Sequence, residues 1–144
     1  MRMTYDNNNI FAKILRGEIP CHKIYEDKHT LAFMDVMPQM DGHCLVIPKA
    51  PSRGLLDAEP ATLTRVMATV QKVAAAAMKA FNADGFQIRQ YNESAGGQTV
   101  FHLHVHILLM KVGVELRGHS GKMADNTQLA AQAKRIIEKL TLVG

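Results

Sequence analysis

The sequence has little of what marks several classes of protein. It has only two cysteines, Cys21 and Cys44, and no Cys-x-x-Cys pair, which excludes a disulfide framework and the common zinc motifs. The N-terminal segment is polar, without the apolar stretch of a signal peptide, and no apolar run reaches the length of a transmembrane span. We therefore expect a cytoplasmic protein that does not associate with membranes.

The sequence also lacks dense clusters of like-charged residues. The formal charge is +4 over 144 residues, and the basic residues are dispersed instead of forming a block of five or more. This pattern does not predict nucleic-acid binding, although it is compatible with a small anionic ligand. With 47% hydrophobic residues, no repeat and no low-complexity tract, residues 1–144 are expected to form a single globular domain.

What the sequence does contain is a run of three histidines that alternate with apolar residues, His102-Leu-His104-Val-His106-Ile-Leu. In a β-strand, side chains at i, i+2 and i+4 share one face at spacings of roughly 6.5–7 Å. The imidazoles would then stand in a row, while the intervening apolar residues face a core. Such a row suits metal binding, or the handling of protons and phosphate near neutral pH. The remaining alternative is a solvent-facing side of an edge strand, for which histidine is a poor choice.

The rest of the pattern predicts an α+β protein. Apolar spacings of three and four residues indicate helices over 10–16, 60–81 and 127–140. Strands are expected at 24–25, 30–34, 43–48, 86–91 and 100–110, separated by short turns. Strands joined in this way suggest an antiparallel meander sheet, with the long helix packed on one face.

The histidine strand would support nucleophilic chemistry at phosphorus. A neutral imidazole attacks phosphorus and forms an N–P bond that water later breaks, provided that its second ring nitrogen is protonated and held. Donors to the phosphoryl oxygens and an acid for the leaving group are also needed, and neighbouring histidines can serve as both. The loop 92–99 before the strand contains Gly96 and Gly97, whose N–H groups can approach an anion, although an ordinary turn has the same composition.

At these residues the chain resembles a known family. Residues 97–108, Gly-Gln-Thr-Val-Phe-His-Leu-His-Val-His-Ile-Leu, are similar to the motif of the histidine triad (HIT) nucleotide hydrolases and transferases, His-φ-His-φ-His-φ-φ with φ apolar. The resemblance extends upstream to the helix and turn at 9–20 and to the strands at 31–36 and 43–49, and so covers residues 9–110. Residues 111–144 would form a C-terminal helical extension of this HIT-like domain.

The resemblance implies a role for each matching residue. The reaction would use a central nucleophile, two flanking histidines, a fourth histidine and two polar residues near the α-phosphate and leaving group: in that order, His104, His102 and His106, His43, and Gln98 and Thr99. The nucleotide would be held by a ribose-binding carboxylate, a phosphate-contacting loop and apolar walls around a purine: in that order, Asp35, Asn92 and Gly97, and Ile10, Phe11, Ile14, Phe33, Val36 and Leu45. Plainer interpretations also exist, since Phe33 and Leu45 suit a core and Asp35 suits a turn.

Several positions depart from the family pattern. Asn9 and Ala12 stand where some members carry the cysteines of a structural zinc site, so neither a metal nor another cofactor is expected. Leu109 and Met110 replace the Pro-Arg that follows the triad in many members, and the tail 111–144 differs as well. The resemblance further implies a homodimer, formed through the long helix and an edge strand.

We therefore predict a hydrolase or transferase, of phosphoramidase or dinucleoside polyphosphate hydrolase type, that acts on the α-phosphate of a purine nucleotide through a nucleotidyl-histidine. One alternative is a nucleotide-binding partner module with little turnover. Another is a metal-binding protein, although the outer two imidazoles of such a row lie roughly 13 Å apart, so one ion would take at most two of the three. His22, His29 and His119 match nothing in the motif and are expected at the surface.

Overall fold

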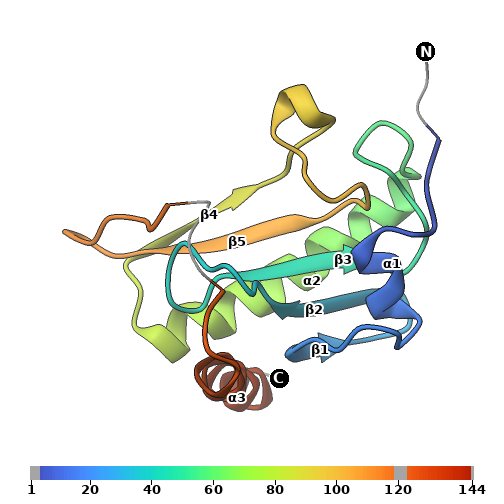
Figure 1. The fold of residues 1–144 in the computed structure, drawn as a ribbon. Helices are drawn as coiled ribbons and strands as arrows, with labels where there is room; N and C mark the ends of the chain where they lie inside the picture. The colour runs from blue at the N-terminus through green and yellow to red at the C-terminus, as the bar shows by residue number, and fades with distance from the viewer. Residues whose placement is uncertain (1–3, 119–122, 144) are drawn as a thin grey trace.

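The computed structural model describes residues 4–118 and 123–143, and its centre is a five-stranded antiparallel sheet (Figure 1). The strands are β1 (Lys23–Glu26), β2 (Thr30–Met34), β3 (Cys44–Pro48), β4 (Gly85–Arg89) and β5 (Val105–Met110). Their order in the sheet is β1-β2-β3-β5-β4. The first three strands form a meander. The strand next to β3 is then β5 and not β4, so the sheet departs from the simple meander that the sequence predicted.

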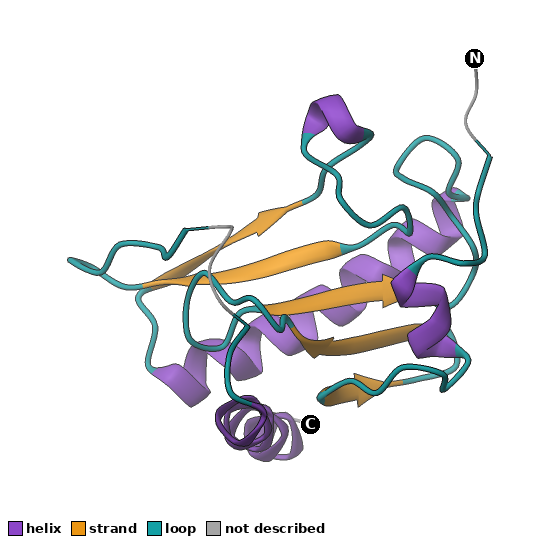
Figure 2. Cartoon of the chain, viewed as in Figure 1, coloured by secondary structure: helices purple, strands orange, loops and turns teal. Residues whose placement is uncertain are grey.

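Helices lie on both faces of this sheet (Figure 2). The long helix α2 (Pro60–Phe81) and the C-terminal helix α3 (Asn126–Val143) pack on one face, where their apolar side chains meet Val46, Ile107 and Leu109. The short helix α1 (Ile10–Leu15) lies on the other face, where Phe11 joins a smaller apolar cluster. A single 3-10 turn, η1 (Ser94–Gly96), interrupts the loop between β4 and β5.

The ends of the helices follow from local chemistry. Asn9 caps α1 by accepting the backbone N–H of Ala12 at 2.9 Å, and Pro60 occupies the first turn of α2, where its missing N–H leaves no bond unmade. At the other end of α2, Asn82 adopts a left-handed conformation with φ 49°, a common way to end a helix. The long helix therefore spans the residues that its apolar spacing predicts.

The C-terminal region belongs to the same core as the sheet. Leu129, Ala133 and Ile136 of α3 are buried in the apolar cluster that α2 forms with the strands. The C-terminal helix α3 is therefore part of the main core instead of lying apart from it. Within the described residues no helix combines the length and apolar character needed to cross a membrane.

One prediction about the histidine segment is wrong in its extent. The strand does not run from 100 to 110 but begins at Val105, so only His106 of the three lies within it. The partner strand β3 pairs with β5 from Cys44 to Val46 and ends at Pro48, which has no N–H to donate to a ladder. The carbonyl oxygen of Pro48 instead accepts a hydrogen bond from Nε2 of His102, at 2.8 Å. The alternation is preserved where the strand exists, since Val105, Ile107 and Leu109 face the main core.

Candidate active site

The histidine cluster lies on the face of the sheet that carries α1, at the point where β5 begins. His102, His104, His106 and His43 are all buried, with 0 to 7% of each residue exposed. The ring of His106 lies 5.1 Å from that of His104 and 5.2 Å from that of His43, measured between centroids. The polar, solvent-facing alternative for this segment therefore does not hold, because the four imidazoles are enclosed by protein.

The hydrogen bonds of His104 determine which of its nitrogens carries a proton. Its Nδ1 lies 2.6 Å from the backbone carbonyl oxygen of His102. A carbonyl only accepts, so Nδ1 must donate, and the neutral ring then holds its free lone pair on Nε2. The edge of this ring also packs against Phe11, with centroids 4.9 Å apart. His104 thus combines a fixed orientation with an unprotonated nitrogen that no described hydrogen bond uses.

His102 supports His104 through an equally defined chain of contacts. Its Nε2 donates to the carbonyl of Pro48, so its Nδ1 must accept, and the donor is the hydroxyl of Tyr5 at 2.7 Å. Tyr5 belongs to the N-terminal segment before α1, and it also packs edge-on against the His102 ring. No motif marked Tyr5 in the sequence. A residue 97 positions away thereby helps to hold the histidine whose carbonyl orients His104.

Burial keeps these two imidazoles neutral. Desolvation lowers the pKa of His102 to about 4, because the charged ring would lose water without gaining an acidic partner. Desolvation also lowers the pKa of His104, and it outweighs two effects that raise it, the hydrogen bond to the His102 carbonyl and the charge of Asp35. At neutral pH the ring of His104 is therefore in the form that attacks an electrophile.

The depressed pKa of His102 predicts how stability depends on pH. The unfolded chain takes up this proton near pH 6.5, whereas the folded chain resists it until about pH 4. Stabilisation is therefore complete above pH 6.5 and is lost as the pH falls toward 4, by roughly 3 kcal/mol from this group. Urea denaturation at pH 7, 5.5 and 4.5 measures the slope, which His102→Gln should reduce and the control His22→Gln should not. A slope that is identical in all three proteins would contradict the assignment.

A second chain of hydrogen bonds joins His43 to His106. The backbone N–H of Gln39 donates to His43 Nδ1 at 3.1 Å, so the neutral ring carries its proton on Nε2. That Nε2 lies 3.0 Å from His106 Nδ1 and 3.3 Å from Oδ2 of Asp35. Donation to His106 Nδ1 leaves the proton of His106 on its Nε2. The buried pair thus forms a relay with one end anchored to the backbone.

The group formed by Asp35, His43 and His106 is also the one candidate metal cluster within residues 4–118 and 123–143. Its ligand atoms lie within 4.8 Å of one another, close enough to share an ion. The protonation pattern does not fit, because a ligating histidine normally donates its second N–H, whereas His43 Nδ1 accepts one from Gln39. Binding at Nε2 would require an imidazolate, so the residues do not favour a metal here.

The loop before the triad is held by contacts that the motif did not reveal. The side chain of Arg53 forms a two-bond ion pair with Glu93, at 2.8 and 2.7 Å, and lies over the ring of Phe101. Glu93 has a positive φ of 63°, a conformation that costs a residue with a side chain about 1–3 kcal/mol. Gly97 has φ 99° and lies against Tyr91, so a Cβ there would meet the ring at 3.2 Å. The Arg53–Glu93 pair therefore secures a strained loop at the mouth of the site.

The structure shows a framework role for Gln98, a residue that is only 3% exposed. Its Nε2 donates to the carbonyls of Arg53 and Val100, at 2.7 and 3.0 Å, and its Oε1 accepts the N–H of Glu93 at 2.8 Å. A direct contact from this amide to a phosphate would require these bonds to break. Gln98 thus acts as a brace between the glycine loop and the loop after β3.

The other predicted site residues are distributed between the framework and the surface. Asn92 is exposed and accepts the N–H of Leu55 at 2.8 Å, which ties the same two loops together. Thr99 is also exposed. Phe11, Phe33 and Leu45 are buried in one apolar cluster that Ile14 partly covers. Two of the residues predicted to surround the purine base are exposed to solvent: Ile10 is 52% exposed and Val36 is 38% exposed.

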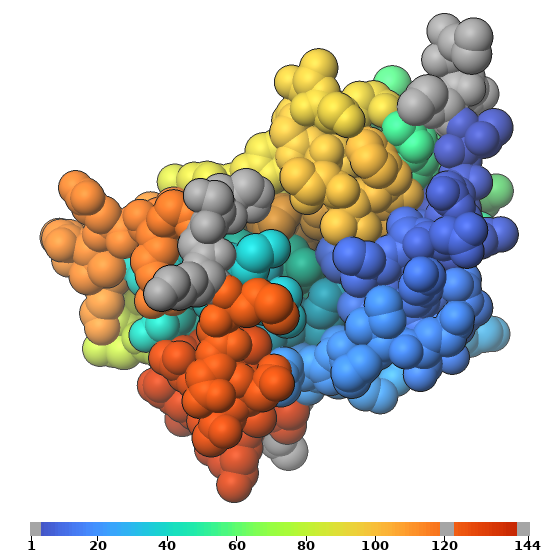
Figure 3. Space-filling model, in the orientation of Figure 1, coloured from blue at the N-terminus to red at the C-terminus, as the bar shows by residue number. Residues whose placement is uncertain are grey.

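The C-terminal segment holds the loop that carries Asp35, a role that sequence reasoning did not identify. Arg117 makes four hydrogen bonds with this loop. Its backbone N–H donates to the carbonyl of Gln39, its own carbonyl accepts from the Gln39 side chain, and its guanidinium donates to the carbonyl of Pro38 and to Asp41. Gln132 of α3 accepts the N–H of Gly42 at 3.1 Å. Figure 3 shows the orange C-terminal region beside the cyan loop. The tail therefore supports the loop that leads into His43.

The remaining histidines lie outside the cluster. His22 and His29 are partly exposed, in keeping with their expected place at the surface. His22 bonds to Asn126 at the start of α3, and His29 lies in the turn between β1 and β2. His119 lies outside the described residues.

An antiparallel α+β domain with four buried histidines at one strand end defines the class of protein, and the comparisons agree. A model of the HIT domain matches residues 16–111. The chain is 35% identical over 139 residues to Adenylylsulfatase HINT3 of Arabidopsis thaliana, covering 92% of this chain and 71% of that protein. This chain therefore belongs to the HIT family.

Solved structures support the same assignment. A Hit-like protein from Bartonella henselae, described as involved in cell-cycle regulation and crystallised with an unknown ligand, superposes with a TM-score of 0.89 at 51% identity. The superposition covers 94% of this chain and 99% of that one. A zinc-bound histidine triad family protein from Mycobacterium smegmatis is 31% identical, with a TM-score of 0.82 over 94% of this chain and 95% of that one. The fold is thus shared by proteins of the same family.

Proposed function

We propose that this protein hydrolyses or transfers nucleotides at the α-phosphate, through a covalent intermediate on His104. The observation that supports this most directly is the bond from His104 Nδ1 to the carbonyl of His102, which leaves the Nε2 lone pair free. The lowered pKa of the ring keeps it in the nucleophilic form at neutral pH. The name of the plant relative, an adenylylsulfatase, matches chemistry at an adenylyl phosphorus.

In the first step, Nε2 of His104 attacks the α-phosphorus, an N–P bond forms, and the bond from phosphorus to the leaving group breaks. The electron pair of that bond goes to the leaving group, which needs a proton to depart easily. His106 can supply it from Nε2 when its ring enters the step protonated on both nitrogens, so that it ends the step as a neutral imidazole. The carboxylate of Asp35, 3.8 Å from His106 Nδ1, compensates the charge of the protonated His106 ring before transfer and the positive charge that develops on His104 as it attacks.

In the second step, water attacks the same phosphorus and the N–P bond breaks, which returns the electron pair to His104 Nε2. His106, now without its Nε2 proton, accepts one from the attacking water, so both histidines end in their starting forms. Transfer to another hydroxyl or amine follows the same course with that group in place of water. The products are a nucleoside monophosphate, or its transferred form, and the free leaving group.

The nucleoside is proposed to be a purine ribonucleoside of adenosine type. Asp35 is partly exposed, and its Oδ1 accepts the backbone N–H of Met37 at 2.8 Å, which holds the carboxylate in place for a ribose. Ile10 and Val36 offer exposed apolar surface, as residues that cover a flat base require. Burying such surface and stacking a base contributes about 1–3 kcal/mol.

Replacing Asp35 by asparagine tests the ribose assignment. The carboxylate would accept from both sugar hydroxyls, and losing a hydrogen bond to a charged group costs about 1.5–3 kcal/mol. We expect the affinity for adenosine monophosphate to fall by about 10- to 100-fold, and that for the 2′-deoxy analogue to fall less. Calorimetric titration of both nucleotides with both proteins measures the difference. Equal losses for the two sugars would assign Asp35 to the support of His43 instead.

The alternative function is a nucleotide-binding module with little turnover. A panel of substrates distinguishes such a module from an enzyme. Adenosine phosphoramidate, a diadenosine polyphosphate and adenosine phosphosulfate all present the same α-phosphorus with different leaving groups. Release of adenosine monophosphate in repeated turnovers from any of them supports the enzyme. Tight binding of all three with no release beyond the spontaneous rate would favour the module.

A homodimer is proposed for the assembly. The edge strand β4 leaves Phe86 and Ile88 46% and 45% exposed, and Met67 of α2 is 41% exposed beside them. Met67 and Ile88 line an apolar groove of about 380 Å³ between α2 and β4. Exposed apolar side chains along an edge strand are typical of a surface that another protein chain covers. Sedimentation equilibrium should give twice the chain mass of 15.9 kDa, and a monomer at micromolar concentration would refute the proposal.

A further inference from the structure

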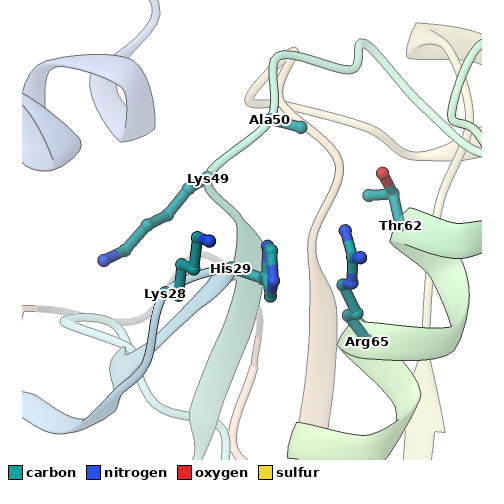
Figure 4. Close-up of a pocket in the computed structure, with 6 residues that line it drawn as sticks. All are labelled: Lys28, His29, Lys49, Ala50, Thr62 and Arg65. Atoms are coloured by element: carbon teal, nitrogen blue, oxygen red, sulfur yellow. The ribbon is translucent and has the colours of Figure 1, made fainter.

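A second candidate site lies away from the histidine cluster, between the β1–β2 turn and α2. It is a cavity of about 290 Å³ (Figure 4), and its lining residues are Lys28, His29, Lys49, Ala50, Thr62 and Arg65. The first two come from the turn, the next two follow β3, and the last two belong to the first two turns of α2. No residue assigned above to the reaction or to nucleotide binding lines this cavity.

The charge around the cavity is positive and only partly compensated. Across residues 4–118 and 123–143, neither the ammonium of Lys28 nor the guanidinium of Arg65 has a carboxylate within 4.0 Å. Lys49 is paired with Glu26 at 2.8 Å, and Glu26 is shared with another lysine. Asp27, next to Lys28 in the turn, is used within that turn, where it accepts backbone N–H groups at 2.8 Å. The cavity therefore offers cations without offering acids.

The arrangement of these groups suits phosphate chemistry. Figure 4 shows Lys28 and His29 on one side and Thr62 and Arg65 on the other, with the ammonium of Lys49 directed away from the helix. Arginine presents a fork of donors that matches phosphoryl oxygens, and lysine adds a point charge. Thr62 also lies in the first turn of α2, where the backbone dipole favours an anion.

The size of the cavity limits what it can hold. A volume of about 290 Å³ lies just below the roughly 300–1,000 Å³ of sites for drug-sized ligands. Cationic groups on two opposite sides can each engage a separate phosphoryl group. We propose that the cavity binds a compact oligophosphate, with one phosphoryl group at Arg65 and Thr62 and the next at Lys28 and His29. The chain of phosphates could be free or form the end of a nucleoside triphosphate.

Titration of the isotope-labelled full chain with tripolyphosphate, without divalent cations, tests this site independently of turnover. Amide shifts should appear at 28–29, 49–50 and 62–65, and calorimetry gives the affinity. Arg65→Gln and Lys28→Gln should each weaken binding by about tenfold or more, because each removes a charge-assisted bond. Lys79→Gln is the matched control, since it makes the same charge change on an exposed residue in the last turn of the same helix. It should weaken binding less than about twofold.

Several outcomes would overturn the proposal. The first is that tripolyphosphate does not bind, and the second is that the amide shifts are confined to residues 92–106. The third is that Lys79→Gln weakens binding as much as the cavity variants do, which would mean attraction by net charge alone. A parallel titration with adenosine triphosphate distinguishes the sources of the ligand. Equal affinity at the same amides means that the phosphate chain alone is recognised, and a higher affinity with shifts at these amides means that a nucleotide supplies it.

Discussion

Replacing His104 by alanine should lower turnover by about three to six orders of magnitude while leaving nucleotide affinity largely unchanged. The reason is that His104 supplies the attacking atom: within the buried cluster, its donated bond fixes the tautomer and leaves Nε2 without a described hydrogen bond. Steady-state rates on a phosphoramidate and calorimetric affinity for adenosine monophosphate separate the two effects. The alanine removes a ring that packs against Phe11 and His106, so the melting temperature has to be measured alongside.

His22→Ala is the matched control for this experiment, since it also removes an imidazole but lies outside the cluster, against Asn126. Its turnover should stay close to that of the wild type. Near-normal turnover in the His104 variant, with the fold intact, would rule out covalent catalysis at this residue.

Replacing His106 by alanine should lower turnover by about two to four orders of magnitude, the range expected for a lost general acid. The loss should depend on the leaving group. It should be largest for an alkylamine, which cannot leave unprotonated, and smallest for sulfate, which leaves readily as an anion. A series of substrates that differ only in the leaving group measures this dependence. The carboxylate and His43 remain in the variant, so their contribution is held constant.

Tyr91→Phe provides a control for packing around His106, because the Tyr91 ring lies 5.7 Å from it and the hydroxyl alone is removed. Its rates should change little and show no trend with the leaving group. If the His106 variant lost the same factor with every leaving group, His106 would be a phosphate-binding residue and not the acid.

The sequence was sufficient to predict the elements that surround the site. Apolar spacing predicted α2 at its observed bounds, and the alternation of apolar residues predicted that Val105, Ile107 and Leu109 face a core. Local pattern could not predict that β5 lies between β3 and β4, because strand order depends on how distant segments pair. It also could not predict that the histidine strand begins at Val105, since that depends on Pro48 in another strand.

The three histidines of the row were identified from their spacing and His43 from the resemblance to the family, but the protonation states of the rings were not predicted. The tautomer of His104 depends on a backbone carbonyl, and that of His43 depends on the N–H of Gln39. Almost every residue carries the same backbone N–H and C=O groups, so a sequence motif does not show which of them will bond to a histidine ring. The same holds for Tyr5, which reaches His102 from the opposite end of the chain. The framework bonds of Gln98 escaped prediction for a related reason, because its three partners are backbone atoms.

The central claim is that phosphorus is attacked twice, first by His104 and then by water. Each in-line displacement inverts the configuration at phosphorus, so two displacements restore it. The most direct measurement is therefore the stereochemical course for the wild-type protein, with a substrate that is chiral at the α-phosphorus and with isotopically labelled water. Retention of configuration, with one labelled oxygen in the released monophosphate, is the predicted result. Inversion would contradict it and would make the histidines an acid–base and phosphate-binding device for direct attack by water.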